Sequence, residues 1–245
     1  MKKRVILMIL DGWGIATNKE ASAVDAAATP FIDGLYETYS HSTLEASGVA
    51  VGLPKGQMGN SEVGHMNIGA GRVVFQDLMK INIAVEKGTF GEEKTLVEAF
   101  DYAKKNQRAI HFIGLVSDGG VHAHLDHLKG LIKAAQKHNC SKVFVHAFTD
   151  GRDCDPKSGL TFINDLLTYL KKYVGSIASV VGRYYAMDRD KRWERVKVAY
   201  EALVKGTGTK TTNVASAIET AYAKDITDEF MPPCLLYTSP SPRDS

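Results

Sequence analysis

Apolar and polar positions along most of the chain form blocks that predict strands alternating with helices. Three short apolar runs have the length of strands buried on both faces: residues 109–116, 142–148 and 176–181. Longer stretches with apolar residues at helical spacing predict helices over residues 77–87, 92–106, 125–138, 158–173 and 191–205. Such alternation is typical of βαβ units, so the predicted fold class is α/β with a parallel-type sheet.

The first 76 residues have a different pattern. Residues 5–10 form one continuous apolar run, which predicts a first strand buried in a parallel sheet. A helix is predicted from Pro30 to about Tyr39. After a loop rich in glycine and proline, a second, short helix is predicted to begin at Ser61. The change of pattern near Gln76 indicates a boundary between two parts of the chain.

The composition is that of an ordinary globular protein. Hydrophobic residues make up 44% of the 245 residues, which is enough for a core. The formal net charge of +2 argues against a nucleic-acid binder that relies on bulk charge. The apolar run at the start is too short for a signal peptide, and no stretch approaches the length of a membrane span. Three widely spaced cysteines form neither a metal pair nor a disulfide framework, which favours a reducing cytoplasm.

Polar, glycine-containing sequences follow each predicted strand, at the edge where a parallel sheet binds its ligands. Arg152, Arg183 and Arg189 lie in these sequences, and each guanidinium offers a planar fork to a phosphate or carboxylate. Asp153 can move protons, although it and Arg152 could also form a local turn pair of little energetic value. Arg195 is expected on the following helix, exposed to solvent. Arginines at two separate strand ends predict a small anionic substrate.

Ser61 places a hydroxyl at a predicted helix start, where the positive potential favours an alkoxide and an incoming phosphate. The alternative is a helix cap without chemistry. Asp11 directly follows the first predicted strand and could bind a divalent cation or form a turn. His122, His124 and His127 could form a metal cluster, but we expect one to contact a ligand and the others to be surface or core groups.

In this order and spacing, these sequences resemble cofactor-independent phosphoglycerate mutases. The resemblance extends from about residue 3 to residue 232. It is carried by LDGWG at residues 10–14, MGNSEVGHMNIGAGR at 58–72, GLVSDGGVHAH at 114–124, FTDGRD at 148–153 and GRYYAMDR at 182–189.

The resemblance implies the interconversion of 3-phosphoglycerate and 2-phosphoglycerate in glycolysis, with two divalent metal ions, usually manganese. It implies that Ser61 is the nucleophile that becomes phosphoserine, and that Asp153 is the acid or base for the glycerate hydroxyls. Asp11 and Ser61 would be metal ligands. The residues that would hold the substrate are His122, Arg152, Asp153, Arg183 and Arg189. The expected partner is this small molecule, without nucleic acid or membrane, for a cytoplasmic monomer.

The resemblance also implies an alkaline-phosphatase-like domain that is split by an inserted α/β transferase domain. We therefore expect residues 1–76 to be the first part of the split domain and residues 77–232 to be the inserted domain. Residues 233–245 are rich in serine and proline and are expected to be an unrelated tail.

The family's chains are about twice as long, and its remaining metal ligands are not found in this sequence. We therefore expect a truncated chain with little or no mutase activity of its own. The alternatives are a non-catalytic phosphoglycerate-binding fragment, or an alkaline-phosphatase-like phosphomutase or hydrolase. The loops at residues 151–153 and 182–185, which resemble the mutase insert, disfavour the hydrolase.

Overall fold

The computed structural model describes residues 4–236. The chain divides after Gln76 into two compact units, Met1–Gln76 and Asp77–Ser245, which are described separately below. Among the described residues, no helix combines the length and the apolar character needed to cross a membrane.

The first unit contains helices but, within its described residues, no strand. Its helices are α1 (Ala23–Ala26), α2 (Pro30–Thr38) and α3 (Ser61–Ala70), with 3-10 turns at Lys19–Ala21 and Gly48–Val51. The predicted helices at Pro30 and Ser61 are confirmed. A small cluster of Val51, Leu53 and Val63 forms the core of this unit.

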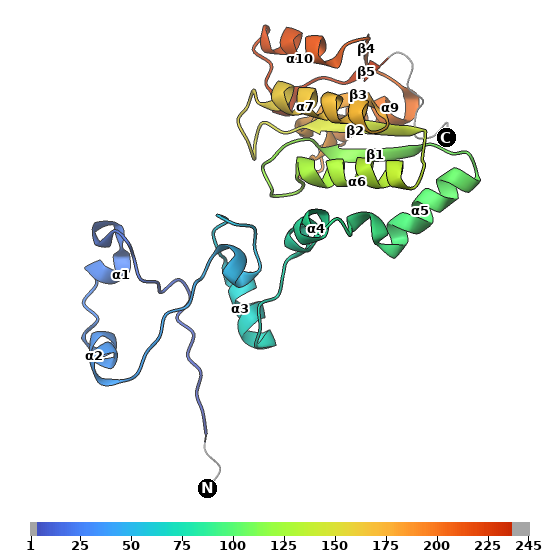
Figure 1. The fold of residues 1–245 in the computed structure, drawn as a ribbon. Helices are drawn as coiled ribbons and strands as arrows, with labels where there is room; N and C mark the ends of the chain where they lie inside the picture. The colour runs from blue at the N-terminus through green and yellow to red at the C-terminus, as the bar shows by residue number, and fades with distance from the viewer. Residues whose placement is uncertain (1–3, 237–245) are drawn as a thin grey trace. The chain divides into compact units, whose positions relative to one another are not determined.

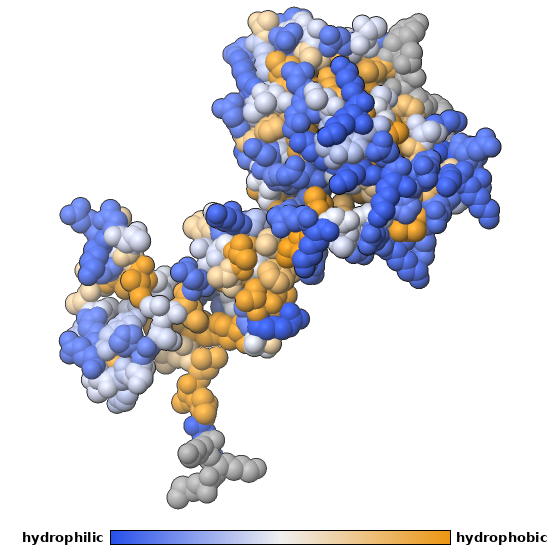
Figure 2. Space-filling model, viewed as in Figure 1, coloured by the Kyte–Doolittle hydropathy of each residue, from blue (hydrophilic) through white to orange (hydrophobic). Residues whose placement is uncertain are grey.

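The prediction of a buried first strand at residues 5–10 is wrong. These residues form no strand, and Val5 is 90% exposed. The run is visible as the hydrophobic segment next to the grey N-terminal residues in Figure 2. A parallel strand is stabilised by the backbone hydrogen bonds of its neighbours, and the described part of this unit contains no strand to pair with the run.

The second unit is built around a five-stranded sheet in the order β1-β2-β3-β5-β4 (Figure 1). The strands are β1 (Ile110–Leu115), β2 (Val143–Thr149), β3 (Ser176–Gly182), β4 (Thr209–Thr211) and β5 (Cys234–Leu236). The first three pair in parallel, as the alternating pattern predicts, whereas β5 runs antiparallel to β3. The mixed α/β fold class with a mainly parallel sheet is therefore confirmed.

Helices alternate with strands along most of the second unit. The helices are α4 (Asp77–Glu86), α5 (Lys94–Lys105), α6 (Leu125–Lys137), α7 (Gly159–Lys172), α8 (Arg183–Ala186), α9 (Trp193–Lys205) and α10 (Val214–Tyr222). Ile132 of α6, Ile163 of α7 and Ile218 of α10 are fully buried against Val145 and Ile177 of the sheet. These contacts form one core that fixes the strand ends.

The sheet extends past the boundary that the sequence suggested at residue 232. Cys234 and Leu235 of β5 pair with both β3 and β4, and Cys234 is buried. The three residues Cys-Leu-Leu suit a buried strand but are too few to show a periodicity. Residues 237–245, the rest of the predicted tail, lie outside the described residues.

A buried histidine connects the three parallel strands. His146 of β2 lies 2.9 Å from His111 Nδ1 on β1 and 2.8 Å from Ser179 Oγ on β3. His146 is 3% exposed, and burial, with a smaller contribution from His111, lowers its pKa to about 4. The folded unit therefore holds this ring neutral at pH 7.

Acidification is expected to weaken this unit through His146. In the unfolded chain the ring titrates near pH 6.5, so between pH 6.5 and about 4 the unfolded state binds more protons. The free energy of unfolding should fall by roughly 3 kcal/mol across this range. Urea unfolding at several pH values should show that the free energy of unfolding depends less on pH in His146→Gln than in the wild type. Identical slopes for wild type and His146→Gln would contradict the expectation.

Candidate functional site

The loops that follow β2 and β3 are joined by ion pairs between Arg183 and two aspartates. Arg183 Nη1 lies 2.7 Å from Asp150 Oδ1 and 2.6 Å from Asp153 Oδ2. Asp150 is 2% exposed and also accepts hydrogen bonds from Ser117 Oγ at 2.6 Å and from the amides of Arg152 and Asp153. Burial alone would raise the pKa of Asp150, but these hydrogen bonds outweigh it and lower that pKa.

Three of the predicted substrate residues meet at one cavity of about 240 Å³. Arg152, Arg183 and Arg189 all line it, so it is called the arginine cavity below. Asp153 lies beside them through its contact with Arg183, and His122 Nε2 is 3.7 Å from Asp153 Oδ2. The structure thus brings the predicted set together at the carboxyl ends of parallel strands, where the sheet topology predicts a ligand site.

Arg195 belongs to the same cavity, and the prediction that it is solvated is wrong. Its side chain is 18% exposed, its guanidinium lies 3.9 Å from the ring centre of Tyr184, and its Nη1 is 3.5 Å from Asp188 Oδ1. Helical spacing places Arg195 on α9 but does not show that the first turn of α9 packs against α8. Glu229 also lines the cavity, and no sequence pattern indicated it.

A second pair of predicted residues meets within the first unit. Ser61 Oγ donates a hydrogen bond to Asp11 Oδ2, although the two residues are 50 positions apart. Ser61 is the first residue of α3, but the helix cap is Asn60, whose side chain accepts a hydrogen bond from the Val63 amide at 3.0 Å. The capping role considered for Ser61 is therefore taken by Asn60, and the serine hydroxyl is available for Asp11.

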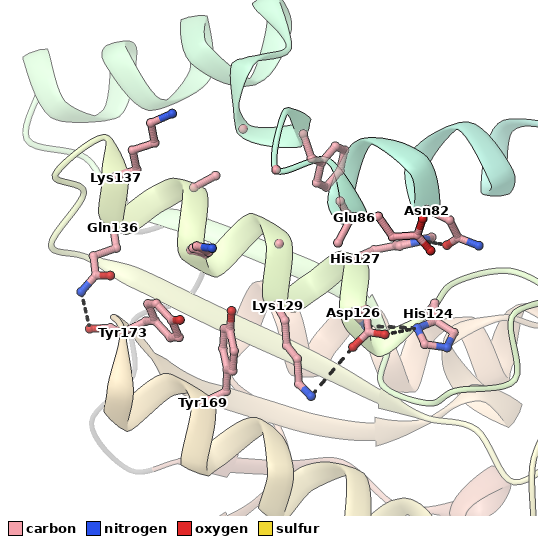
Figure 3. A pocket seen from close by; sticks show the side chains of 17 residues that line it. Asn82, Glu86, His124, Asp126, His127, Lys129, Gln136, Lys137, Tyr169 and Tyr173 are labelled. Atoms are coloured by element: carbon pink, nitrogen blue, oxygen red, sulfur yellow. Dashed lines mark hydrogen bonds and ion pairs between the residues drawn. The ribbon is translucent and has the colours of Figure 1, made fainter.

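The histidines after β1 do not form a metal cluster. His124 accepts a hydrogen bond from the Asp126 amide and caps α6, while His127 contacts Asn82 of α4. Both line a larger cavity of about 890 Å³ between α4, α6 and α7, where Lys129 reaches Asp126 (Figure 3). None of the predicted site residues lines this cavity. The two histidines therefore have local structural roles.

Asp11 and Ser61 are oxygen donors of the type that divalent cations bind. Across residues 4–236, however, no group of three or more His, Cys, Asp or Glu side chains is arranged to hold a metal ion. Two donors are fewer than protein metal sites use. The described residues therefore do not by themselves fit the metal centre that the sequence resemblance implies.

The family model described as BPG-independent PGAM N-terminus matches residues 81–244, about two thirds of the chain. The chain belongs to the cofactor-independent phosphoglycerate mutase family. This family is metal-dependent in general. The family assignment confirms the resemblance found in the sequence motifs.

Relatives of this chain are similar over almost all of its length. The 2,3-bisphosphoglycerate-independent phosphoglycerate mutase of Flavobacterium johnsoniae is 58% identical over 96% of the chain, and that of Bacteroides fragilis is 54% identical over 95%. The chain covers 47% and 46% of these proteins, so it spans about half the length of the curated relatives it matches. A crystal structure of Leishmania mexicana phosphoglycerate mutase at low cobalt concentration has a TM-score of 0.70 and 34% identity, covering 91% of this chain and 42% of that one.

Asp150→Asn is expected to lower the free energy of unfolding by about 3 kcal/mol. The amide cannot pair with Arg183 as a charge, and only Asp153 remains to do so. Guanidinium chloride unfolding would measure the loss. Asp126→Asn is the matched control, because Asp126 is an exposed carboxylate 3.9 Å from Lys129 Nζ, and its change should stay below about 0.5 kcal/mol. Equal losses of stability in the two variants would show that the interactions of Asp150 contribute no more than those of an exposed aspartate.

Proposed function

We propose that the chain binds phosphoglycerate in the arginine cavity of the second unit and takes the phosphoryl group on Ser61. It would thereby serve the interconversion of 3-phosphoglycerate and 2-phosphoglycerate. The observation that carries the proposal is the meeting of Arg152, Arg183 and Arg189 at one cavity. The names of the relatives, which are 2,3-bisphosphoglycerate-independent phosphoglycerate mutases, support this substrate.

The arginines differ in how free they are to bind a ligand. Arg183 is held by Asp150 and Asp153, so its guanidinium is fixed in direction. Arg189 is exposed and makes no ion pair with any described residue, and Arg152 lies 3.6 Å from Glu229. A phosphoglycerate carries a carboxylate and a phosphate, which are the two groups that the guanidinium fork recognises. Arg189 and Arg152 would therefore bind the anionic groups, and Arg183 would orient the aspartates beside them.

Ser61 is suited to accept a phosphoryl group. Its hydroxyl lies in the first turn of α3, whose amides and dipole stabilise a bound phosphate. In the proposed step the Ser61 Oγ–P bond forms as the bond from phosphorus to the glycerate oxygen breaks, and the proton that Ser61 Oγ gives up goes to that oxygen. The other glycerate hydroxyl then gives up its proton as it attacks the phosphoserine, and this proton goes to Ser61 Oγ, which restores Ser61. Asp153, with His122 Nε2 3.7 Å away, is the group proposed to take and return these protons.

Two divalent ions, manganese by the family resemblance, belong to this proposal. When bound they would supply positive charge to the phosphate, and Asp11 and Ser61 would be two of their ligands. No step above depends on their geometry. The proposal also includes the cytoplasm as the location and a monomer as the functional state, which the sequence resemblance suggests.

Phosphoglycerate binding without phosphoryl transfer is a second candidate function. It is favoured by the small number of metal donors among the described residues. After incubation of the full chain with 3-phosphoglycerate and Mn²⁺, mass spectrometry should find phosphoserine at Ser61 if transfer occurs, and Ser61→Ala should lack it. Binding without phosphoserine would favour the second function. Turnover at rates typical of the family would contradict the expectation of low activity for this chain.

Arg189→Gln is expected to weaken binding of 3-phosphoglycerate about tenfold or more, because it removes a charge-assisted hydrogen bond to the ligand. Isothermal titration calorimetry would measure the dissociation constant. The control is Arg108→Gln, which removes an exposed arginine that does not line this cavity. If both variants bind like the wild type, the cavity is not the phosphoglycerate site.

A further inference from the structure

One segment distant in sequence completes the wall of the arginine cavity. The 3-10 turn Asp228–Phe230 lies across the ends of β2 and β3. Thr149 Oγ1 donates a hydrogen bond of 2.7 Å to the Asp228 carbonyl, and the Gly182 amide donates one of 2.7 Å to the Met231 carbonyl. The turn is therefore attached to the last residue of each strand.

The side chain of Asp228 also connects this turn to α7 and α10. Asp228 is 1% exposed, and its carboxylate accepts hydrogen bonds from the Gly159 amide at 2.7 Å and from the Tyr222 hydroxyl. A carboxylate buried in this way has its acceptor sites filled by the fold, so it is not available to a ligand. Asp228 thus positions the backbone of the next residue, Glu229.

Two glycines allow the strand ends to approach Glu229 closely. A Cβ at Gly182 would lie 2.3 Å from the Glu229 carbonyl oxygen, and a Cβ at Gly151 would lie 2.8 Å from the Glu229 amide nitrogen. Phe230 packs on the other side against Tyr184, with ring centres 4.9 Å apart. The backbone at Glu229 therefore has little room to move, and its side chain is directed to the cavity that it lines.

The contact between Glu229 and Arg152 is an ion pair but not a hydrogen bond. Glu229 Oε1 lies 3.6 Å from Arg152 Nη1, whereas Arg183 is 2.6–2.7 Å from its two aspartates. The side chain of Arg152 is 57% exposed and that of Glu229 is 22% exposed. A pair this loose and this open to water costs little to separate. Arg152 is therefore partly neutralised by Glu229 but can still turn to another anion.

We propose that Glu229 is a built-in counter-ion of Arg152 that competes with the anionic ligand and keeps its binding weak. This proposal rests on the proposed function of the arginine cavity as a ligand site. Binding would exchange the carboxylate of Glu229 for the ligand's anionic group on Arg152. Glu229 then remains in the cavity wall as a negative charge, which repels a dianion more strongly than a monoanion. Weak binding of this kind favours release of the product.

The test compares Glu229→Gln with the wild-type full chain, using inorganic phosphate and glycerate as probes. The glutamine side chain has nearly the same shape as glutamate but no charge, so the ligand no longer competes with a carboxylate for Arg152. We expect binding to tighten about tenfold for phosphate and about threefold for glycerate, since the repulsion that is removed grows with ligand charge. Glu229→Ala should also tighten binding, more for phosphate than for glycerate, and it controls for an effect of the new amide. Titration calorimetry gives both constants, and thermal unfolding checks that each variant is folded.

Glu194→Gln is the matched control, because it removes the same charge from an exposed position on α9 that does not line the cavity. Its binding constants should stay within about twofold of the wild type. Equal or weaker phosphate binding in both Glu229 variants would overturn the proposal, as would the absence of measurable phosphate binding in every protein. If phosphate binding tightens but 3-phosphoglycerate does not bind to any variant, the counter-ion proposal stands and the proposed function fails.

Discussion

A single buried carboxylate, that of Asp150, connects the loops after all three parallel strands. Ser117 follows β1, Asp150 follows β2, and Arg183 follows β3, and the first and last both contact the middle one. Removing a carboxylate from water is costly unless every acceptor site is filled, and here backbone amides, a hydroxyl and a guanidinium fill them. The same cluster holds Arg152 and Arg183, two of the arginines that line the cavity.

The two units use their apolar residues in different ways. In the second unit, the helices bury Ile132, Ile163 and Ile218 against the sheet. The strand ends are therefore rigid supports for the charged loops. In the first unit the apolar run at residues 5–10 is exposed, and among its described residues the core is limited to three side chains. Yet Asp11 and Ser61 still meet, because Asn60 caps α3 and leaves the serine hydroxyl to the aspartate.

Sequence periodicity predicted the long elements of the second unit and the place of its site. Strands of six or seven residues and helices of ten or more repeat their pattern often enough to be recognised, whereas β4 and β5 have three residues each. The rule that ligands bind at the carboxyl ends of parallel strands placed Arg152 and Arg183 together. Arg195 and Glu229 escaped prediction because tertiary packing, not local pattern, brings them to the cavity. The strand predicted at residues 5–10 was wrong because an apolar run does not specify partner strands.

The hydrogen bond from Thr149 to Asp228 joins positions 79 residues apart. Contacts of such long sequence separation are slow to form, so we expect this one to form after the local helices and the β1-β2-β3 core. During synthesis, the strand ends with Arg152 and Arg183 leave the ribosome well before the turn that carries Glu229. For that interval the nascent chain presents Arg152 without Glu229. We therefore expect assembly of the cavity wall to be a late step that changes the charge of a surface already in place.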